Sequence, residues 1–176
     1  TSSNKTPMGP GKRVLDATQT AFGADGSRPG RYSGSARDLI DVLAKKHSVK
    51  PENIVLGCGS TQILRTVTHV FTAKDKPLVA TIPTYEECAD YATLMGNKVI
   101  GVPLDSEFRP DLDRFAAAAK GAGLVFYCNP SNPSATFVGA KPTRDFIAKL
   151  NTGSPGTTIL VDEAYFEYVT NPDHET

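Results

Sequence analysis

Short apolar runs alternate along the chain with longer segments in which apolar residues recur every three or four positions. Runs of the first kind, rich in β-branched residues and bounded by Gly, Pro or Asp, predict buried strands, whereas segments of the second kind predict helices packed on one face. The predicted strands cover residues 54–56, 78–82, 99–102, 124–128 and 159–161. The predicted helices cover residues 35–47, 61–71, 84–96, 111–119 and 143–150.

Strands that alternate with helices are typical of an α/β fold, in which a mostly parallel sheet is sandwiched by helices on both faces. Residues 1–34 show no sustained period and are rich in Gly, Ser, Thr and Pro, which predicts an extended N-terminal arm. Residues 35–176 contain all of the predicted strands and end in a loop-like tail after Tyr168. We therefore predict an arm followed by one α/β region.

Composition narrows the possible functions. The 19 basic and 19 acidic residues balance, which argues against nucleic acid or a membrane surface as a partner. No apolar stretch approaches the roughly 20 residues of a membrane-spanning helix. The three widely spaced cysteines form neither a metal-ligand set nor a disulfide framework and favour a reducing compartment, so we predict the cytoplasm. Because the chain starts with Thr1, we expect that its natural N-terminus was removed or is not included.

A glycine-rich turn, Gly-Cys-Gly-Ser-Thr-Gln, lies between the strand at 54–56 and the next helix. Gly59 allows the backbone to approach a ligand closely, and the free N–H groups of the first helical turn point at it. The hydroxyls of Ser60 and Thr61 add two donors, so the turn is a candidate phosphate site. It has neither the Walker pattern nor the dinucleotide pattern, and helix capping without a ligand explains the turn equally well.

An acidic residue, Asp162, directly follows the strand at 159–161, and Tyr165 comes three residues later. The carboxyl ends of parallel strands form the edge at which open α/β sheets bind ligands. Asp162 is therefore a candidate site residue. Its alternative role is to cap the turn after the strand.

Two more polar signals follow strands. Tyr85 comes after the strand at 78–82, at the start of a helix for which Thr84 and Glu87 predict a capping box. Packing against a neighbouring helix is the alternative role for this ring. Asn132 stands between two prolines after the strand at 124–128, and the Asn-Pro steps there predict a rigid turn at the sheet edge.

Taken in order, the segments RYS, PENIVLGCGSTQIL, PTYEECADY, CNPSNPSATF and VDEAYFEY resemble the first half of a fold-type-I aminotransferase. These enzymes use pyridoxal 5′-phosphate (PLP), and the chain is most similar to the histidinol-phosphate aminotransferase-like subgroup. The resemblance spans roughly residues 31–168, and the joint order of the motifs is more specific than any one of them. It implies that residues 35–176 are the first part of the PLP-binding large domain.

The resemblance also implies that eight residues bind the cofactor. They are Gly59, Ser60, Thr61, Tyr85, Asn132, Asp162, Tyr165 and Tyr32. The first three would hold the PLP phosphate, and the match to Tyr32 reaches across a homodimer to the partner's phosphate.

The remaining four residues would surround the ring of the cofactor. Tyr85 would stack on the pyridine ring, while Asn132 and Tyr165 would hydrogen-bond its 3′ oxygen. Asp162 would pair with the protonated ring nitrogen, and a cation beside a carboxylate lowers its pKa. The implied site contains no metal.

Several family features have no match in this chain. The lysine that forms the Schiff base and the arginine that binds the substrate carboxylate would lie beyond Thr176, so no catalytic residue is assigned here and we interpret the chain as a fragment of a longer enzyme. The arm reads Ala-Thr-Gln-Thr-Ala-Phe-Gly at residues 17–23, where relatives show an Asn-Glu-Asn-Pro type of stretch. Asn-Pro-Ser-Ala replaces the usual Asn-Pro-Thr-Gly, which is a milder change.

The resemblance implies an aminotransferase that moves an amino group between an amino acid, or an amino-alcohol phosphate, and a 2-oxo acid. A PLP-dependent decarboxylase or lyase of the same fold is an alternative, because such enzymes share the cofactor site. A non-catalytic subunit with this fold is another. The last alternative is an unrelated α/β domain that binds a nucleotide or sugar phosphate, which would give Asp162 and Tyr165 no reason to share a pocket with Ser60 and Tyr85.

Overall fold

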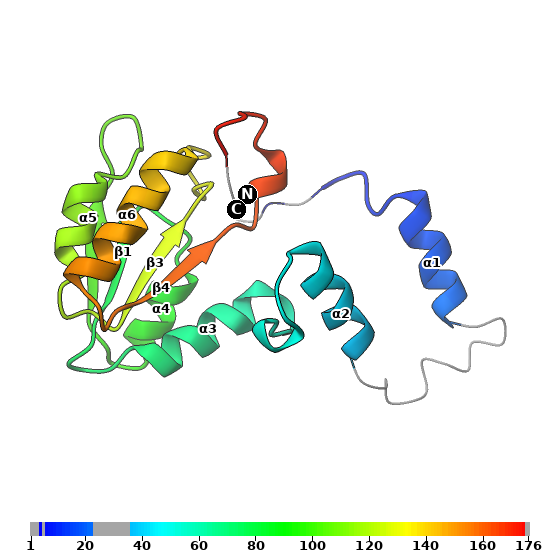
Figure 1. Ribbon diagram of the computed structural model, residues 1–176, viewed down its shortest axis with the longest axis horizontal. Helices are drawn as coiled ribbons and strands as arrows, with labels where there is room; N and C mark the ends of the chain where they lie inside the picture. The colour runs from blue at the N-terminus through cyan, green and yellow to red at the C-terminus, as the bar shows by residue number, and fades with distance from the viewer. Residues whose placement is uncertain (1–3, 5, 23–35, 175–176) are drawn as a thin grey trace. The chain divides into compact units, whose positions relative to one another are not determined.

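The computed structural model describes residues 4, 6–22 and 36–174, and the chain divides into two compact units, Thr1–Val55 and Leu56–Thr176 (Figure 1). The described part of the first unit contains the helices α1 (Lys12–Phe22) and α2 (Arg37–Lys46) and the 3-10 turn η2 (Pro51–Asn53). The second unit contains α3 (Gly59–Phe71), β1 (Leu78–Ile82), α4 (Glu87–Leu94), β2 (Val99–Pro103), α5 (Leu112–Ala118), β3 (Leu124–Cys128), α6 (Ala140–Gly153), β4 (Thr158–Asp162) and η3 (Phe166–Tyr168).

The four strands of the second unit form one parallel sheet in the order β2-β1-β3-β4. The helices α4, α5 and α6 connect successive strands, as parallel pairing requires. In the β3–β4 ladder, Leu124 lies opposite Thr158 and Cys128 lies opposite Asp162. This arrangement confirms the predicted α/β fold with a mostly parallel sheet.

Helices cover both faces of the sheet, with α5 and α6 on one side and α3 and α4 on the other (Figure 1). Against α5 and α6, the rings of Phe115, Tyr127 and Phe146 pack with centroids 5.1 to 6.3 Å apart. Against α3 and α4, a second buried cluster includes Leu64 and Cys88. Because neither face of the central strands meets water, β3 is apolar and buried along its whole length, as a strand covered on both sides must be.

The predicted strand at residues 54–56 is wrong. The segment follows η2, whose turn is closed by hydrogen bonds from Asn53 N to Lys50 O (2.9 Å) and from Ile54 N to Pro51 O (3.1 Å). Val55 is 76% exposed and no strand pairs with this segment in the described residues. A run of three apolar residues is too short to show whether a partner strand exists, and pairing decides whether a strand forms.

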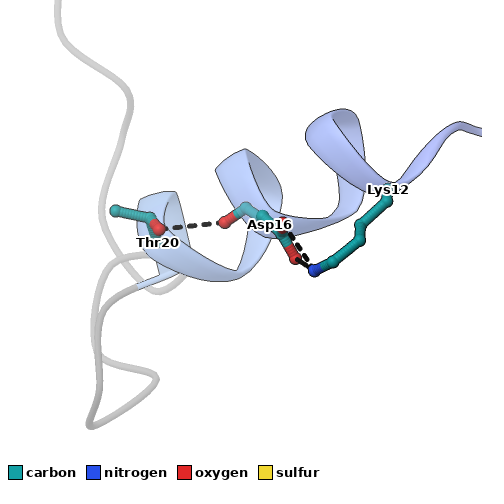
Figure 2. A network of polar contacts seen from close by, with 3 residues as sticks. All are labelled: Lys12, Asp16 and Thr20. Atoms are coloured by element: carbon teal, nitrogen blue, oxygen red, sulfur yellow. Dashed lines mark hydrogen bonds and ion pairs between the residues drawn. The ribbon is translucent and has the colours of Figure 1, made fainter.

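The predicted extended arm is also wrong where it is described, because α1 is a helix of 11 residues. Its segment lacks Gly and Pro, although the arm as a whole is rich in both. Local contacts one turn apart support it: Lys12 Nζ lies 2.8 Å from an Asp16 carboxylate oxygen, and the Thr20 hydroxyl donates to the Asp16 carbonyl at 2.9 Å (Figure 2). The helix buries none of its residues, so these local interactions are its main support within the described residues.

Helix boundaries differ from the predictions by a few residues. The helix α3 begins at Gly59 rather than Thr61, and α6 runs from Ala140 to Gly153 rather than over 143–150. The helix α4 begins at Glu87 rather than at Thr84. The predicted capping box does not form, since the buried Thr84 hydroxyl has no hydrogen-bond partner in the described residues. The helix α5 begins as expected, with Asp111 accepting a hydrogen bond from Arg114 N at 3.0 Å.

Within the described residues, none of the helices combines the length and the apolar character that a membrane span needs.

The aromatic cluster predicts how stability depends on one side chain. Phe115 is fully buried between Tyr127 and Phe146, so Phe115→Ala leaves a cavity and should lower the free energy of unfolding by about 3–5 kcal/mol. Leu94→Ala is the control, because Leu94 is 81% exposed and its loss should cost less than about 0.5 kcal/mol. Urea unfolding followed by circular dichroism measures both, and equal effects would contradict the described core.

Candidate functional site

The carboxyl ends of β1, β3 and β4 lie at one edge of the sheet, since neighbouring parallel strands point the same way. Four predicted site residues follow these ends at short distances along the chain. Tyr85 comes three residues after β1, Asn132 four residues after β3, Asp162 is the last residue of β4, and Tyr165 follows three residues later. The topology therefore brings these residues to one edge.

Asp162 is half-buried and held by backbone groups on both sides. Its carboxylate Oδ1 accepts a hydrogen bond from Ala164 N at 3.0 Å, and its carbonyl accepts one from Asn129 N at 3.0 Å. Burial raises the pKa of Asp162 above its ordinary value, and the Ala164 N–H offsets this only in part. The lowered pKa that the sequence predicts is therefore not found in the chain by itself, because the cation that would lower it belongs to the ligand.

Two buried thiols lie within electrostatic range of Asp162. Burial raises the pKa of Cys88 on α4 and of Cys128 on β3 to about 11 each, and the negative charge of Asp162 contributes in the same direction. Both thiols are therefore neutral at pH 7. Neither thiol therefore adds a negative charge beside Asp162.

A residue that the sequence analysis did not single out holds the loop after β3. The buried Asn129 donates from Nδ2 to the carbonyl of Val138 at 3.0 Å, and its Oδ1 accepts from Val138 N at 2.8 Å. This pair of bonds closes the loop that contains Asn132. The side chain of Asn132 is half-buried and has no hydrogen-bond partner in the described residues, so its amide is available to a ligand.

The start of α3 is open to an anion. Gly59 has a φ of +74°, which L side chains rarely adopt, and a Cβ at this position would meet nothing within 4 Å. The N-cap residue Cys58 makes no capping hydrogen bond with its side chain. In the described part of the chain, the hydroxyls of Ser60 and Thr61 have no partner, and their N–H groups belong to the first turn, which leaves its donors free. We call residues 59–61 the anion loop.

The aromatic candidates occupy half-buried positions. Tyr85 packs against the buried cluster between the sheet and α3 and α4, so the packing interpretation holds for part of its ring. The buried hydroxyl of the preceding Thr84 has no hydrogen-bond partner in the described part of the chain, so a polar ligand would satisfy it. Tyr165 has its ring centroid 6.4 Å from that of Tyr168. Tyr32 lies outside the described residues.

The helices α3 and α4 connect the anion loop to the sheet edge. The Cys88 thiol of α4 contacts the carbonyl of Leu64 in α3 at 4.0 Å, and its pKa responds to Asp162 at the end of β4. The candidate groups are therefore the donors of the anion loop, the aromatic rings and the half-buried carboxylate of Asp162. These groups suit a planar aromatic ligand with an anionic substituent and a basic ring nitrogen, and PLP has this chemistry. Among the described residues, no group of three or more His, Cys, Asp or Glu side chains could hold a metal ion.

Comparison with known proteins agrees with this chemistry. The model of the family "Aminotransferase class I and II" matches residues 2–176, so the chain belongs to this family. It is 35% identical over 170 residues to a histidinol-phosphate aminotransferase of Moorella thermoacetica, covering 96% of this chain and 42% of that protein. A histidinol-phosphate aminotransferase of Symbiobacterium thermophilum is 33% identical over 172 residues, covering 97% and 46%.

A solved structure shows the same relationship in three dimensions. The crystal structure of histidinol-phosphate aminotransferase from Sinorhizobium meliloti in complex with pyridoxal-5′-phosphate superposes with a TM-score of 0.85 at 26% identity. The match covers 98% of this chain and 45% of that one. The chain thus spans less than half the length of the relatives that it matches.

The raised pKa of Asp162 predicts a pH-dependent effect on stability without ligand. The folded chain binds the Asp162 proton more tightly than the unfolded chain does. Protonation of Asp162 therefore stabilises the fold fully below the ordinary pKa of about 4, and this stabilisation is lost as the pH rises through the raised pKa. Asp162→Asn should therefore raise the urea midpoint at pH 7, and this advantage should shrink as the pH falls. Asp75→Asn, at an exposed turn, is the control. An advantage of Asp162→Asn that is independent of pH would contradict the assigned cause.

Proposed function

We propose that the protein is a PLP-dependent aminotransferase of the histidinol-phosphate aminotransferase type. It transfers an amino group between an amino acid or amino-alcohol phosphate and a 2-oxo acid. The observation that carries this proposal is the half-buried carboxylate of Asp162 at the carboxyl end of β4, on the same sheet edge as Tyr85 and Asn132. The family membership of the chain and the PLP complex of the Sinorhizobium meliloti relative support the choice of cofactor.

The chain's own residues divide the work of holding the cofactor. When bound, PLP supplies an electron sink for the bond that breaks at the substrate's α-carbon. The anion loop donates N–H and O–H groups to the phosphate at the positive end of the α3 dipole. Tyr85 stacks on the ring by its exposed part, and the free amide of Asn132 and the hydroxyl of Tyr165 hydrogen-bond the 3′ oxygen.

Asp162 holds the proton on the ring nitrogen. Burial makes an isolated carboxylate costly, as its raised pKa indicates, and a neighbouring pyridinium reverses the direction of that shift. Cys88 and Cys128 stay neutral at pH 7, so neither thiol competes with Asp162 for the pyridinium. The same burial that destabilises Asp162 without ligand strengthens its pairing with a cation.

Replacing this carboxylate tests the function. Asp162→Asn keeps the size of the side chain and the acceptor for Ala164 N but removes the charge. In the full chain we expect kcat to fall by about a hundredfold or more, since the lost interaction acts mainly in the transition state. PLP should remain bound, as its absorption spectrum would show.

Asp75→Asn is again the control, and product analysis completes the test. Transfer of the amino group to an added 2-oxo acid supports an aminotransferase, whereas release of carbon dioxide without transfer identifies a decarboxylase. Near-normal kcat in Asp162→Asn would leave Asp162 with only its turn-capping role.

We also propose that the protein acts in the cytoplasm as a homodimer in which Tyr32 serves the phosphate of the partner's site. This tyrosine lies between Gly and Pro residues in the arm. A residue that completes a neighbouring site makes each site depend on both chains, as symmetric dimers permit.

Complementation between two inactive variants tests this assignment. When Tyr32→Ala and Asp162→Asn chains are co-expressed, mixed dimers should contain one site with both defects and one with neither. Random pairing makes half of the dimers mixed, so about a quarter of the wild-type activity should return. If Tyr32 serves its own subunit, each mixed-dimer site has one defect and activity stays at the level of the separate variants.

A further inference from the structure

A charged contact joins the two helices that flank the anion loop and Tyr85. The Arg65 side chain of α3 places Nε 2.5 Å from Oε1 of Glu87, the first residue of α4. Its guanidinium carbon also lies 5.7 Å from the ring centroid of Tyr91. Glu87 and Tyr91 are four residues apart and so lie on one face of α4. We call these three residues the α3–α4 clamp.

The clamp differs in burial from the ion pair that joins α5 and α6. The Glu87 side chain is only 18% exposed, whereas Asp113, which pairs with Lys149 between α5 and α6, is 86% exposed. A partly buried acceptor is less screened by water, so the pair is stronger than an ordinary surface pair. Glu87 raises the pKa of Arg65 further, so its positive charge is permanent.

A buried contact lies beside the clamp. Leu64 of α3, next to Arg65, belongs to the same core cluster as Cys88 and Ala92 of α4, and the Cys88 thiol contacts the Leu64 carbonyl. This buried contact holds the two helices together, and the clamp adds a polar contact beside it. A guanidinium that is hydrogen-bonded through Nε and stacked on a ring has a defined direction. The clamp therefore adds a directional contact between α3 and α4 to the non-directional packing of their buried residues.

The position of the clamp connects it to the site. Arg65 comes six residues after Gly59, about 9 Å along the helix, and Glu87 comes two residues after Tyr85. A shallow groove over the clamp is lined by Tyr91, Arg65 and Thr61, among others, and so extends from α4 back to the anion loop. The phosphate donors thus lie in the first turn of α3, and Tyr85 lies two residues before the start of α4.

We propose that Arg65 is a positioning residue: it fixes the anion loop at the distance and angle from Tyr85 that one PLP molecule spans. This inference rests on the proposed function. In this proposal Arg65 acts through the positions of α3 and α4 and makes no contact with the cofactor itself. Arg65 should therefore affect the affinity for ligands that contact both the anion loop and Tyr85, but not the affinity for ligands that contact the anion loop alone.

Two ligands separate these cases in the full chain. Pyridoxamine 5′-phosphate engages both parts of the site, and inorganic phosphate engages only the loop. Arg65→Met keeps the aliphatic bulk of the side chain and removes its planar guanidinium group. We expect its affinity for pyridoxamine 5′-phosphate, measured by titration calorimetry, to fall about fivefold to tenfold. Affinity for inorganic phosphate should stay within about twofold, because a charge about 9 Å away along the helix is largely screened at physiological ionic strength.

A spectroscopic measurement reports the orientation of the ring directly. At saturating pyridoxamine 5′-phosphate, the induced circular dichroism of the bound ring should change in Arg65→Met, because the ring tilts relative to Tyr85. Arg65→Lys, which retains the charge but lacks the planar fork, should show an intermediate loss of affinity. This second variant also provides the test if Arg65→Met does not fold.

Lys149→Met is the matched control, since it removes an ion pair between helices on the opposite face of the sheet. It should leave both affinities unchanged. Unchanged affinity and dichroism in Arg65→Met would overturn the positioning role and leave the proposed function intact. An equal loss of affinity for both ligands would also overturn the positioning role and would indicate damage to the anion loop. Failure of the unaltered protein to bind pyridoxamine 5′-phosphate would overturn the proposed function and the clamp with it.

Discussion

Parallel pairing of β3 with both of its neighbours is the constraint on which the rest of the second unit depends. Because β1 and β4 run in the same direction as β3, every chain segment that leaves these strands does so at one edge. The price of this arrangement is that both faces need helices, and the two buried clusters supply them. The polar residues at the edge are thus fixed by an apolar core that has no chemical role of its own.

Much of this fold could be predicted from the sequence, because strands covered on both faces contain continuous apolar runs. β3 is the clearest case, with five consecutive buried residues. The run at residues 54–56 has the same local signal but lacks a neighbour, and pairing between distant segments is not encoded in a three-residue pattern. The helix α1 was hidden for the opposite reason: composition averaged over the arm masked a stretch without Gly or Pro.

In the candidate site, too, features that local sequence patterns mark could be predicted, and features that depend on contacts between distant residues could not. The position of Asp162, Asn132 and Tyr85 at the sheet edge could be predicted, because each stands next to a strand end that the pattern locates. The bridge from Asn129 to Val138 and the contact from Arg65 to Glu87 could not, since the second pair lies 22 residues apart and nothing local marks either partner. The pKa of Asp162 depends on burial and on the presence of a cation, so its direction in the ligand-free chain follows only from the structure.

In the described residues, β4 pairs on one side only, with β3, and all five of its residues are half-buried. Any further strand that adds to the free side of β4 would remove more water from Asp162. The pKa of Asp162 would then rise further without ligand, and its pairing with a bound cation would become stronger. Growth of the sheet and affinity for a protonated ring are therefore thermodynamically linked, so binding the ring would favour completion of the sheet by the same free energy with which completion favours binding.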